Sequence, residues 1–193
     1  MIFPEFDNMN IIDEIRDKYD PLAKLVRPHI TLVFPFEMDI TNDELSLIME
    51  KRLSEIEAFE IDMQGFSKCE DRFGNYLFLN VVNGTEIITH LHDLLYSNEF
   101  SEFDLGMQYV PHMTVGKLKT TEELNEAYDS VKENKTLFRS MITKISVEMI
   151  GKNEDPPAGG LLPQPLCGRF SPIWFGTRNL QNALPLLFSY CRS

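Results

Sequence analysis

The sequence predicts an α+β fold of two pseudo-symmetric lobes, each a mixed, mostly antiparallel sheet packed with two helices, arranged around a central cleft. Helical and strand-like periodicities alternate along the chain up to residue 155. The order of elements in residues 1–67 recurs in residues 75–150, and two similar pentapeptides occupy the third element of each copy. Two copies of one unit commonly pack about a pseudo-twofold axis, so we expect the pentapeptides to meet across the cleft.

The first copy contains five expected elements. Residues 1–6 are expected to form a short first strand, and apolar residues at helical spacing predict a helix over 11–19. An apolar, β-rich run predicts a strand over 30–36. A Thr followed three residues later by a Glu forms a capping box and opens the helix expected over 41–56. Residues 59–66 alternate apolar and polar side chains, as a strand does.

The second copy repeats this order. Residues 76–82 predict a strand that ends at an Asn-Gly turn, and apolar residues at helical spacing predict a helix over 87–95. A strand over 110–118 carries the second pentapeptide. A second capping box opens the helix expected over 120–131. Strict alternation over 141–150 predicts a strand with one buried face.

The composition changes abruptly near residue 155, which we take as the end of the two-lobed domain. All 30 acidic residues lie at or before Asp155, whereas residues 156–193 contain no Asp, Glu or Lys and hold six of the 11 prolines. This tail is either a Pro-rich C-terminal extension or sequence foreign to the fold. In both cases we expect it to be poorly ordered or loosely packed and without a function.

The charge of the chain limits its partners. The formal net charge is −12, from 18 basic and 30 acidic side chains. A protein that coats duplex nucleic acid carries the opposite charge, because its affinity comes from neutralising phosphates. The charge therefore excludes that class, and an RNA end or a small nucleotide is the expected substrate.

Cysteine usage and hydropathy indicate the compartment. The 3 cysteines have no CxxC spacing and no neighbouring histidine cluster, so neither a disulfide framework nor a zinc site is expected. No apolar run approaches the length of about 18 residues expected of a membrane span. The first residues lack the basic start and apolar core of a signal peptide. These features predict a cytoplasmic protein without membrane partners, and they leave its oligomeric state open.

The two pentapeptides carry the chemistry of the chain. They are Pro28-His29-Ile30-Thr31-Leu32 and Pro111-His112-Met113-Thr114-Val115. Side chains alternate between the two faces of a strand. His29 and Thr31 therefore share one face, as do His112 and Thr114, while the apolar residues between them point the other way and can pack against helices.

Paired imidazoles and hydroxyls suit acid–base chemistry on a phosphodiester. Histidine titrates near neutral pH, so one imidazole can accept a proton while another donates one. Thr hydroxyls can donate hydrogen bonds to phosphate oxygens and hold the group between the imidazoles. We therefore expect His29 and His112 to be catalytic and Thr31 and Thr114 to bind the phosphate, with no metal ion or other cofactor. The competing interpretation is a pair of buried histidines in a duplicated core.

Other polar residues carry weaker signals. His90 and His92 lie two residues apart on a helix, point away from each other and are expected at the surface. Lys117 is expected on the strand face opposite His112, and Cys69 is expected to be inert. One or two of the basic residues near the motif strands are expected to line the cleft; these residues are Arg16, Lys18, Lys24, Arg27 and Lys119.

Paired His-x-Thr segments in a two-lobed repeat resemble the 2H phosphoesterase superfamily, which includes 2′-5′ RNA ligase-like proteins and RNA 2′,3′-cyclic phosphodiesterases. The stretches KYDPLA at 18–23 and PHITLVFPF at 28–36 are similar to a small subfamily of Gram-positive bacteria. The resemblance covers roughly residues 1 to 154. It implies a bilobal fold with a central cleft, His29 and His112 as the catalytic pair, Thr31 and Thr114 as phosphate ligands, and no required metal.

Two features depart from the family pattern. The first strand is short at its N-terminus, and the tail from about Pro156 stands where a closing strand is expected. Neither departure touches the His-x-Thr segments.

We therefore expect a metal-independent phosphoesterase that acts on a 2′,3′-cyclic or 2′-5′ phosphodiester of RNA or a nucleotide. Hydrolysis and end joining use the same groups in opposite directions. The alternative is a non-catalytic module that binds phosphorylated RNA ends or nucleotides, and a third interpretation is an oligomeric or structural protein with buried histidines. Turnover separates the first from the second, and titration of the imidazoles separates the first from the third.

Overall fold

The computed structural model describes residues 1–150 and 174–178. Its helices are α1 (Met9–Tyr19), α2 (Asn42–Leu53), α3 (Thr85–Tyr96) and α4 (Thr121–Val131), with a short 3₁₀ helix η1 (Ser101–Phe103). Its strands are β1 (Phe59–Asp71), β2 (Gly74–Asn83), β3 (His112–Leu118), β4 (Phe138–Ile142), β5 (Ser146–Ile150) and β6 (Trp174–Arg178). The α+β class predicted from the sequence is confirmed.

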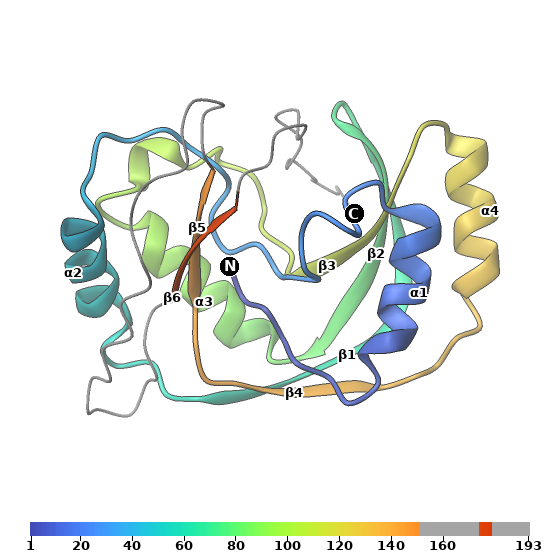
Figure 1. Cartoon of the computed structure of the whole chain (residues 1–193), viewed down its shortest axis with the longest axis horizontal. Coiled ribbons are helices and arrows are strands. Elements are labelled where there is room, and N and C mark those ends of the chain that lie inside the picture. Colours follow the sequence, from blue (N-terminus) through green and yellow to red (C-terminus); the bar gives the residue numbers. More distant parts are fainter. Residues whose placement is uncertain (151–173, 179–193) are drawn as a thin grey trace.

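Four strands form one strongly curled antiparallel sheet in the order β3-β2-β1-β4 (Figure 1). The remaining two strands, β5 and β6, pair in parallel as a separate sheet. Leu77 and Leu79 of β2 point into the main core, whereas Tyr76 and Phe78 point to the opposite face and form a small cluster with Cys69. The sheet therefore has one face in the main core and a second face that carries a separate, smaller buried cluster.

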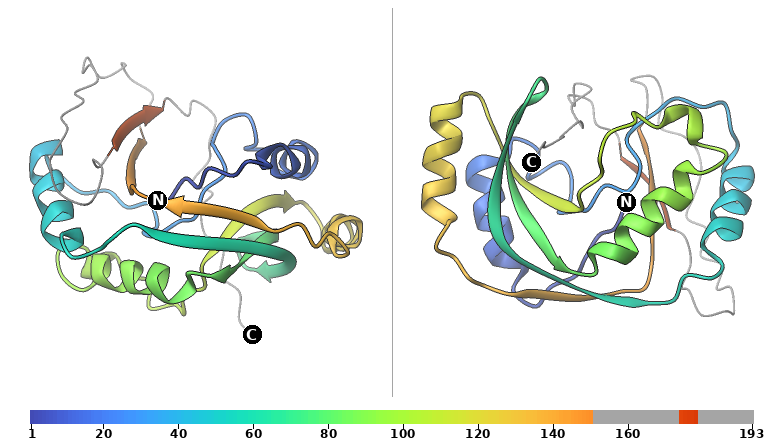
Figure 2. Two further views of the ribbon diagram at one scale, coloured as in Figure 1. Left: turned by 90° about the horizontal axis from the view of Figure 1, so that it is seen from below. Right: turned by 180° about the vertical axis from the view of Figure 1, so that it is seen from behind.

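The helices lie in two pairs at opposite sides of the sheet (Figures 1 and 2). Helices α1 and α4 lie side by side, with a hydrogen bond of 2.8 Å between the hydroxyls of Tyr19 and Ser130. On the other side α2 and α3 are neighbours, and Arg52 pairs with Glu99 just beyond α3. The apolar stripes that predicted these helices are the faces they bury, since Ile12, Leu91 and Leu124 are all fully buried.

The helix starts follow the predicted capping. Thr41 forms a complete capping box with Glu44, as expected. At α4 the Thr120 hydroxyl accepts from the Glu123 amide. The Glu123 carboxylate, however, accepts from the backbone amide of Lys119 and not from that of Thr120. Only half of the second predicted capping box is present.

The strand predicted over 30–36 is wrong. Only Ile30 of that run pairs with neighbouring strands, through single antiparallel bridges to Ile2 on one side and Met113 on the other. Pro35 has no amide hydrogen to donate to a ladder, and side chains from elsewhere bind several of the other backbone groups. The predicted strand over 1–6 is likewise reduced to the bridge at Ile2.

The strand predicted over 141–150 is interrupted at residues 143–145. The part before the break pairs with β1 as β4, whereas Ser146 exchanges backbone hydrogen bonds of 2.8 and 2.9 Å with Met1. The chain thus leaves the main sheet to join the N-terminal segment. An alternating pattern is compatible with either partner, because it reports which face is buried and not which strand lies alongside.

The pseudo-symmetry of two lobes stays a prediction. The helices do lie in two pairs, but the four strands of the sheet all come from residues 59–142. Among the described residues before it, Ile30 forms a single β-bridge to the sheet, at Met113, and Ile2 forms one to Ile30. The domain limits at 155 and the repeat boundaries also stay predictions. The tail expected over 156–193 lies outside the described residues except for β6. None of the described helices has the length and apolar character needed to cross a bilayer.

Candidate active site

The middle residues of the two His-x-Thr segments face each other across a backbone bridge. Ile30 pairs antiparallel with Met113, and both side chains are fully buried. Residues next to an antiparallel pair lie opposite each other on the two chains. The bridge therefore sets His29 opposite Thr114 and Thr31 opposite His112. Because side chains alternate, all four lie on the face away from Ile30 and Met113, and each of the four is partly exposed.

The two segments are held by different means. The second belongs to β3, where Met113 pairs with Leu79 and Thr114 pairs with Phe78. The first belongs to no regular strand, and its anchors on either side of Ile30 are the bridges to Ile2 and Met113. A continuous row of buried residues thus runs from Ile2 through Ile30 and Met113 to Leu79, and the site lies on the other side of this row.

Both imidazoles are oriented by the same local contact. His29 Nδ1 lies 2.8 Å from the carbonyl oxygen of Arg27, and His112 Nδ1 lies 2.7 Å from that of Val110. A carbonyl only accepts, so Nδ1 carries the hydrogen in each ring. In the neutral ring the lone pair that accepts a proton is then on Nε2.

Aromatic rings pack beside each imidazole and lower its pKa. The ring of Phe3 lies 5.7 Å from that of His29, and Phe78 of β2 stacks on His112 at 3.8 Å. Burial lowers the pKa of both imidazoles to about 4, against the Nδ1 hydrogen bonds, which raise it. At His29 the Arg16 guanidinium lowers the pKa further. Both rings are therefore neutral near pH 7 in the free protein.

A β-bulge changes the position of Lys117. Between the pairs Leu77–Gly116 and Phe78–Thr114, β2 advances by one residue and β3 by two, so Val115 is the extra residue. The bulge reverses the alternation beyond it, and Lys117 pairs with Tyr76 on the face that also carries Thr114. The expectation that Lys117 lies on the opposite face is wrong, because period-two counting does not see a bulge.

The Lys117 ammonium lies 5.1 Å from the centre of the Tyr76 ring and is buried. It has no hydrogen-bond partner among the residues that the structure describes. Burial lowers its pKa, and the carboxylates of Asp71 and Asp20 raise it.

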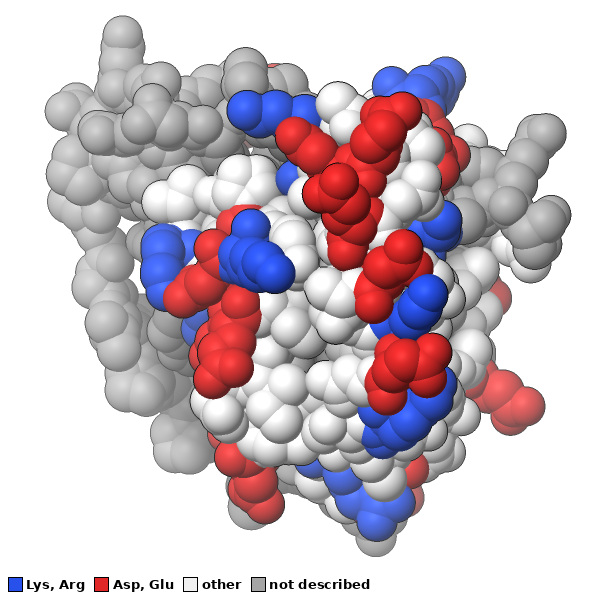
Figure 3. All heavy atoms as spheres, turned by 90° about the vertical axis from the view of Figure 1, so that its right-hand side faces the viewer, with Lys and Arg blue, Asp and Glu red and all other residues white. Residues whose placement is uncertain are grey.

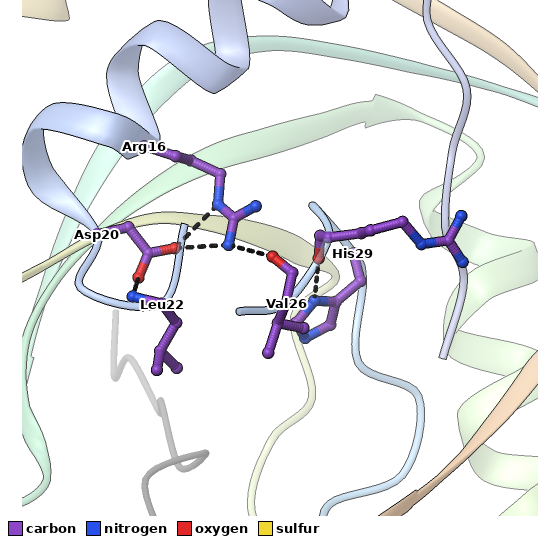
Figure 4. A network of polar contacts seen from close by, with 6 residues as sticks. Arg16, Asp20, Leu22, Val26 and His29 are labelled. Carbon is purple, nitrogen blue, oxygen red and sulfur yellow. Dashed lines mark hydrogen bonds and ion pairs between the residues drawn. The ribbon is translucent and has the colours of Figure 1, made fainter. Parts of the chain in front are cut away.

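Arg16 of α1 is buried and binds the chain just before the first His-x-Thr segment (Figure 4). It is 2% exposed, pairs with Asp20 one helical turn later, and donates to the Val26 carbonyl at 2.8 Å. Asp20 in turn accepts from the Leu22 amide at 2.9 Å. This network fixes the loop that leads into His29. The four-residue spacing of Arg16 and Asp20 is its only signal in the sequence.

The other basic residues near the motifs are less engaged. Lys24 pairs with Asp17 at the surface, and the exposed Arg27 guanidinium lies 4.2 Å from the Phe3 ring. Arg27 and Phe3 also line a cavity of about 310 Å³ beside the first segment. Lys18 lies over the Tyr19 ring at 4.7 Å. Arg27 thus contacts Phe3, whose ring lies beside the His29 imidazole.

The surface position expected for His92 is wrong. His92 is 6% exposed, and its Nδ1 lies 2.7 Å from the Leu32 carbonyl oxygen, whereas His90 is exposed as expected. Sequence reasoning also missed Tyr109, whose hydroxyl donates to the Thr31 carbonyl at 2.7 Å. No pattern marks either residue in the sequence, because their partners are backbone groups far away along the chain.

No three His, Cys, Asp or Glu side chains in the described part of the chain gather into a set that could hold a metal ion. Cys69, expected to be inert, is a buried cysteine on the sheet face that carries Tyr76 and Phe78.

Comparison with known proteins identifies the family of the chain. The family model of the 2′-5′ RNA ligase superfamily matches residues 4–153. A protein of Geobacillus thermodenitrificans named "Putative phosphoesterase" is 28% identical over 148 residues, which cover 75% of this chain and 82% of the relative. Similarly named proteins of Geobacillus kaustophilus and Bacillus licheniformis are 29% identical over 151 residues and 27% identical over 135 residues. They cover 75% and 68% of this chain, and 82% and 77% of the respective relatives. The chain belongs to the 2′-5′ RNA ligase superfamily, the 2H phosphoesterases.

Proposed function

We propose that this protein is a metal-independent phosphoesterase that hydrolyses a 2′,3′-cyclic or 2′-5′ phosphodiester of RNA or a nucleotide. The observation that carries the proposal is the Ile30–Met113 bridge, which sets two His-Thr pairs on one face of two adjoining segments. Family membership supports phosphoesterase activity. The shared Nδ1 contacts support a role for the two Nε2 atoms, since both rings present the same nitrogen to a substrate.

The two imidazoles divide the proton transfers between them. One accepts a proton from water through Nε2 as the water oxygen forms its bond to phosphorus. The bond from phosphorus to a ribose oxygen breaks, and the other imidazole gives its proton to that oxygen. The products are a phosphomonoester and a ribose hydroxyl, and each ring ends in the state in which the other began. Joining two ends uses the same groups with a hydroxyl of a second end in the place of water. Its oxygen bonds to the phosphorus of a cyclic phosphate while one imidazole takes its proton. The bond from phosphorus to one ring oxygen breaks, and the other imidazole gives its proton to that oxygen.

The lowered pKa values suit this division. A neutral imidazole is ready to act as the base at pH 7, and the acid needs a proton that the free protein does not hold. A phosphate anion between the rings favours the protonated form of its neighbour and so raises that pKa. Substrate binding thus favours protonation of the imidazole that acts as the acid. We assign Thr31 and Thr114 to the non-bridging oxygens, because each lies opposite the histidine of the other segment.

The test is hydrolysis of nucleoside 2′,3′-cyclic phosphates and of RNA that ends in a cyclic phosphate, with EDTA present. We expect activity that survives chelation and a bell-shaped pH profile, because one ring must be neutral and the other protonated. His29→Ala and His112→Ala should each lose at least about 100-fold in kcat, the scale of general acid–base catalysis. The exposed His90→Ala is the matched control and should retain full activity. Full activity in either motif variant contradicts the paired mechanism.

The same assay tests the alternative of a binding module. Nucleotide binding without turnover across the whole substrate panel, in wild type and at every pH, would overturn the proposed hydrolysis and favour capture of phosphorylated ends.

We further propose a small nucleotide or an RNA end as the substrate and the cytoplasm as the compartment. A net charge of −12 opposes the coating of a duplex. On the face formed by α1 and α4, acidic and basic side chains are interspersed, and the described residues there form no continuous basic area (Figure 3).

A further inference from the structure

Three side chains bind the backbone of the first His-x-Thr segment where a strand ladder is missing. The Tyr109 hydroxyl donates to the Thr31 carbonyl at 2.7 Å, and His92 Nδ1 donates to the Leu32 carbonyl at 2.7 Å. The Tyr96 hydroxyl accepts from the Phe34 amide at 3.0 Å. A backbone without a ladder needs such partners, since unpaired buried carbonyls and amides are costly.

These side chains hold one another in place. The His92 and Tyr109 rings stack at 3.9 Å with an angle of 3° between their planes. The Tyr96 ring meets His92 edge-on at 4.8 Å. His92 and Tyr96 lie one turn apart on α3 and are 6% and 5% exposed, so both are fixed by packing. The three rings form a rigid unit, which we call the aromatic clamp: His92, Tyr96 and Tyr109.

The clamp also joins the two halves of the site. Tyr109 precedes Val110, whose carbonyl orients the His112 ring. Its hydroxyl meanwhile holds the carbonyl of Thr31. Tyr109 thus binds the backbone of the first segment and is the neighbour of Val110, whose carbonyl orients the His112 imidazole.

Two members of the clamp, His92 and Tyr109, donate hydrogen bonds to backbone carbonyls. Burial raises the pKa of the Tyr109 hydroxyl, so it remains a donor. His92 Nδ1 donates to the Leu32 carbonyl, because a carbonyl oxygen only accepts.

We propose that His92 and Tyr109 are positioning residues that set the first His-Thr pair against the second. The proposal rests on the function proposed above. A displacement of about 1 Å can cost on the order of 100-fold in rate when reacting groups must meet in one geometry. The clamp can control a displacement of this size, because Tyr109 binds the backbone carbonyl of Thr31 itself.

The test uses substitutions that keep the rings and remove the hydrogen bonds. Tyr109→Phe and His92→Phe should lower kcat at least tenfold on a nucleoside 2′,3′-cyclic phosphate, with a smaller change in KM. His92→Asn should restore most of the kcat, because its amide nitrogen can occupy the position of Nδ1. The matched controls are His90→Phe on the exposed face of α3 and Tyr19→Phe, which loses a hydrogen bond to Ser130 far along the chain. Both controls should retain wild-type kcat.

Two further measurements separate positioning from simple stability and from failure of the proposed function. Urea denaturation should show folded variants at the assay temperature. Without substrate, two quantities should change in Tyr109→Phe and not in Tyr19→Phe. One is the rate of amide hydrogen exchange in the first His-x-Thr segment, and the other is the ¹⁵N chemical shifts of the His29 ring. Wild-type kcat in folded Tyr109→Phe overturns the proposal. A wild type without turnover overturns the proposed function alone, and unchanged exchange and ring shifts in Tyr109→Phe then overturn the clamp as well.

Discussion

At the scale of single residues, the two histidines owe their orientation to the prolines before them. Each Nδ1 donates to the carbonyl of the residue that precedes a proline, Arg27 before Pro28 and Val110 before Pro111. A residue before proline is restricted to extended conformations, and the proline ring fixes the next φ angle. The acceptor carbonyl and the imidazole are thus set by covalent geometry before any tertiary contact forms.

Replacing Pro111 should therefore disturb catalysis more than stability. In Pro111→Ala we expect kcat to fall roughly threefold to tenfold as the His112 ring gains freedom, with a loss of about 0.4–1 kcal/mol in the free energy of unfolding. Steady-state kinetics and urea denaturation measure the two quantities. His90→Ala, on the exposed face of α3, is the control and should leave kcat unchanged. An unchanged kcat in Pro111→Ala contradicts the argument.

The lowered imidazole pKa values also predict how stability depends on pH. The folded-state pKa of about 4 lies below the unfolded value of about 6.5, so the unfolded chain binds more protons between the two. The stabilisation is complete above pH 6.5 and is lost as the pH falls toward 4. At pH 5 each histidine should account for roughly 1–2 kcal/mol of lost stability. Urea denaturation at pH 7 and pH 5 should show a smaller loss in His29→Gln and His112→Gln than in wild type and His90→Gln. Equal losses in all four proteins would refute the lowered pKa values of His29 and His112.

At the scale of elements, helices could be predicted from the sequence and strand pairing only in part. A helix binds its own backbone groups, so the apolar stripes of α1–α4, together with the Thr caps of α2 and α4, predict all four helices. The backbone of residues 31–34 instead finds its partners in Tyr109, His92 and Tyr96, which no local pattern reveals. The bulge at Val115 likewise cannot be predicted from the alternation of side chains. It places Lys117 on the same face of the sheet as Thr114.

The junction between β2 and α3 makes the clearest element-scale prediction. Gly84 has φ of +88°, and an added Cβ would lie 2.8 Å from Ile61 Cγ2 and 3.0 Å from the Glu60 carbonyl oxygen. Gly84→Ala should therefore cost both the left-handed backbone strain and a clash, about 2–4 kcal/mol together. At Gly106, where φ is +63° and a Cβ meets nothing within 4 Å, the substitution should cost only about 1 kcal/mol. Chemical denaturation of the two variants checks the difference, and equal costs would contradict the clash.

At the scale of the whole molecule, the candidate site could be predicted better than the fold around it. The four motif residues lie about one bridge, because two buried apolar residues, Ile30 and Met113, bring their segments together. The duplication suggested such a meeting but not its form. The long antiparallel sheet lies wholly in residues 59–142, so the two-lobed symmetry itself stays a prediction.

The overall charge leads to a prediction about inhibitors. With a net charge of −12, the protein should not bind duplex RNA at about 0.15 M salt, because there is no release of phosphate counterions to drive association. Hydrolysis of a cyclic mononucleotide should therefore proceed at the same rate with and without a blunt duplex that lacks a terminal cyclic phosphate. A single strand that ends in a cyclic phosphate should compete as an alternative substrate. Competitive inhibition by the duplex at micromolar concentration would show a nucleic-acid surface that the charge does not suggest.

The single bridge between Ile30 and Met113 has a consequence for folding. Contacts between positions so distant in the chain form late, because the loop entropy must be overcome before they stabilise anything. Helices α1, α2, α3 and α4 can form earlier from local contacts. During refolding from urea, far-UV circular dichroism should accordingly recover before the hydroxyl and imidazole pairs assemble. Catalytic competence is then the last property that this chain acquires, and it reports complete folding of residues 1–150 more strictly than any spectroscopic probe of its helices.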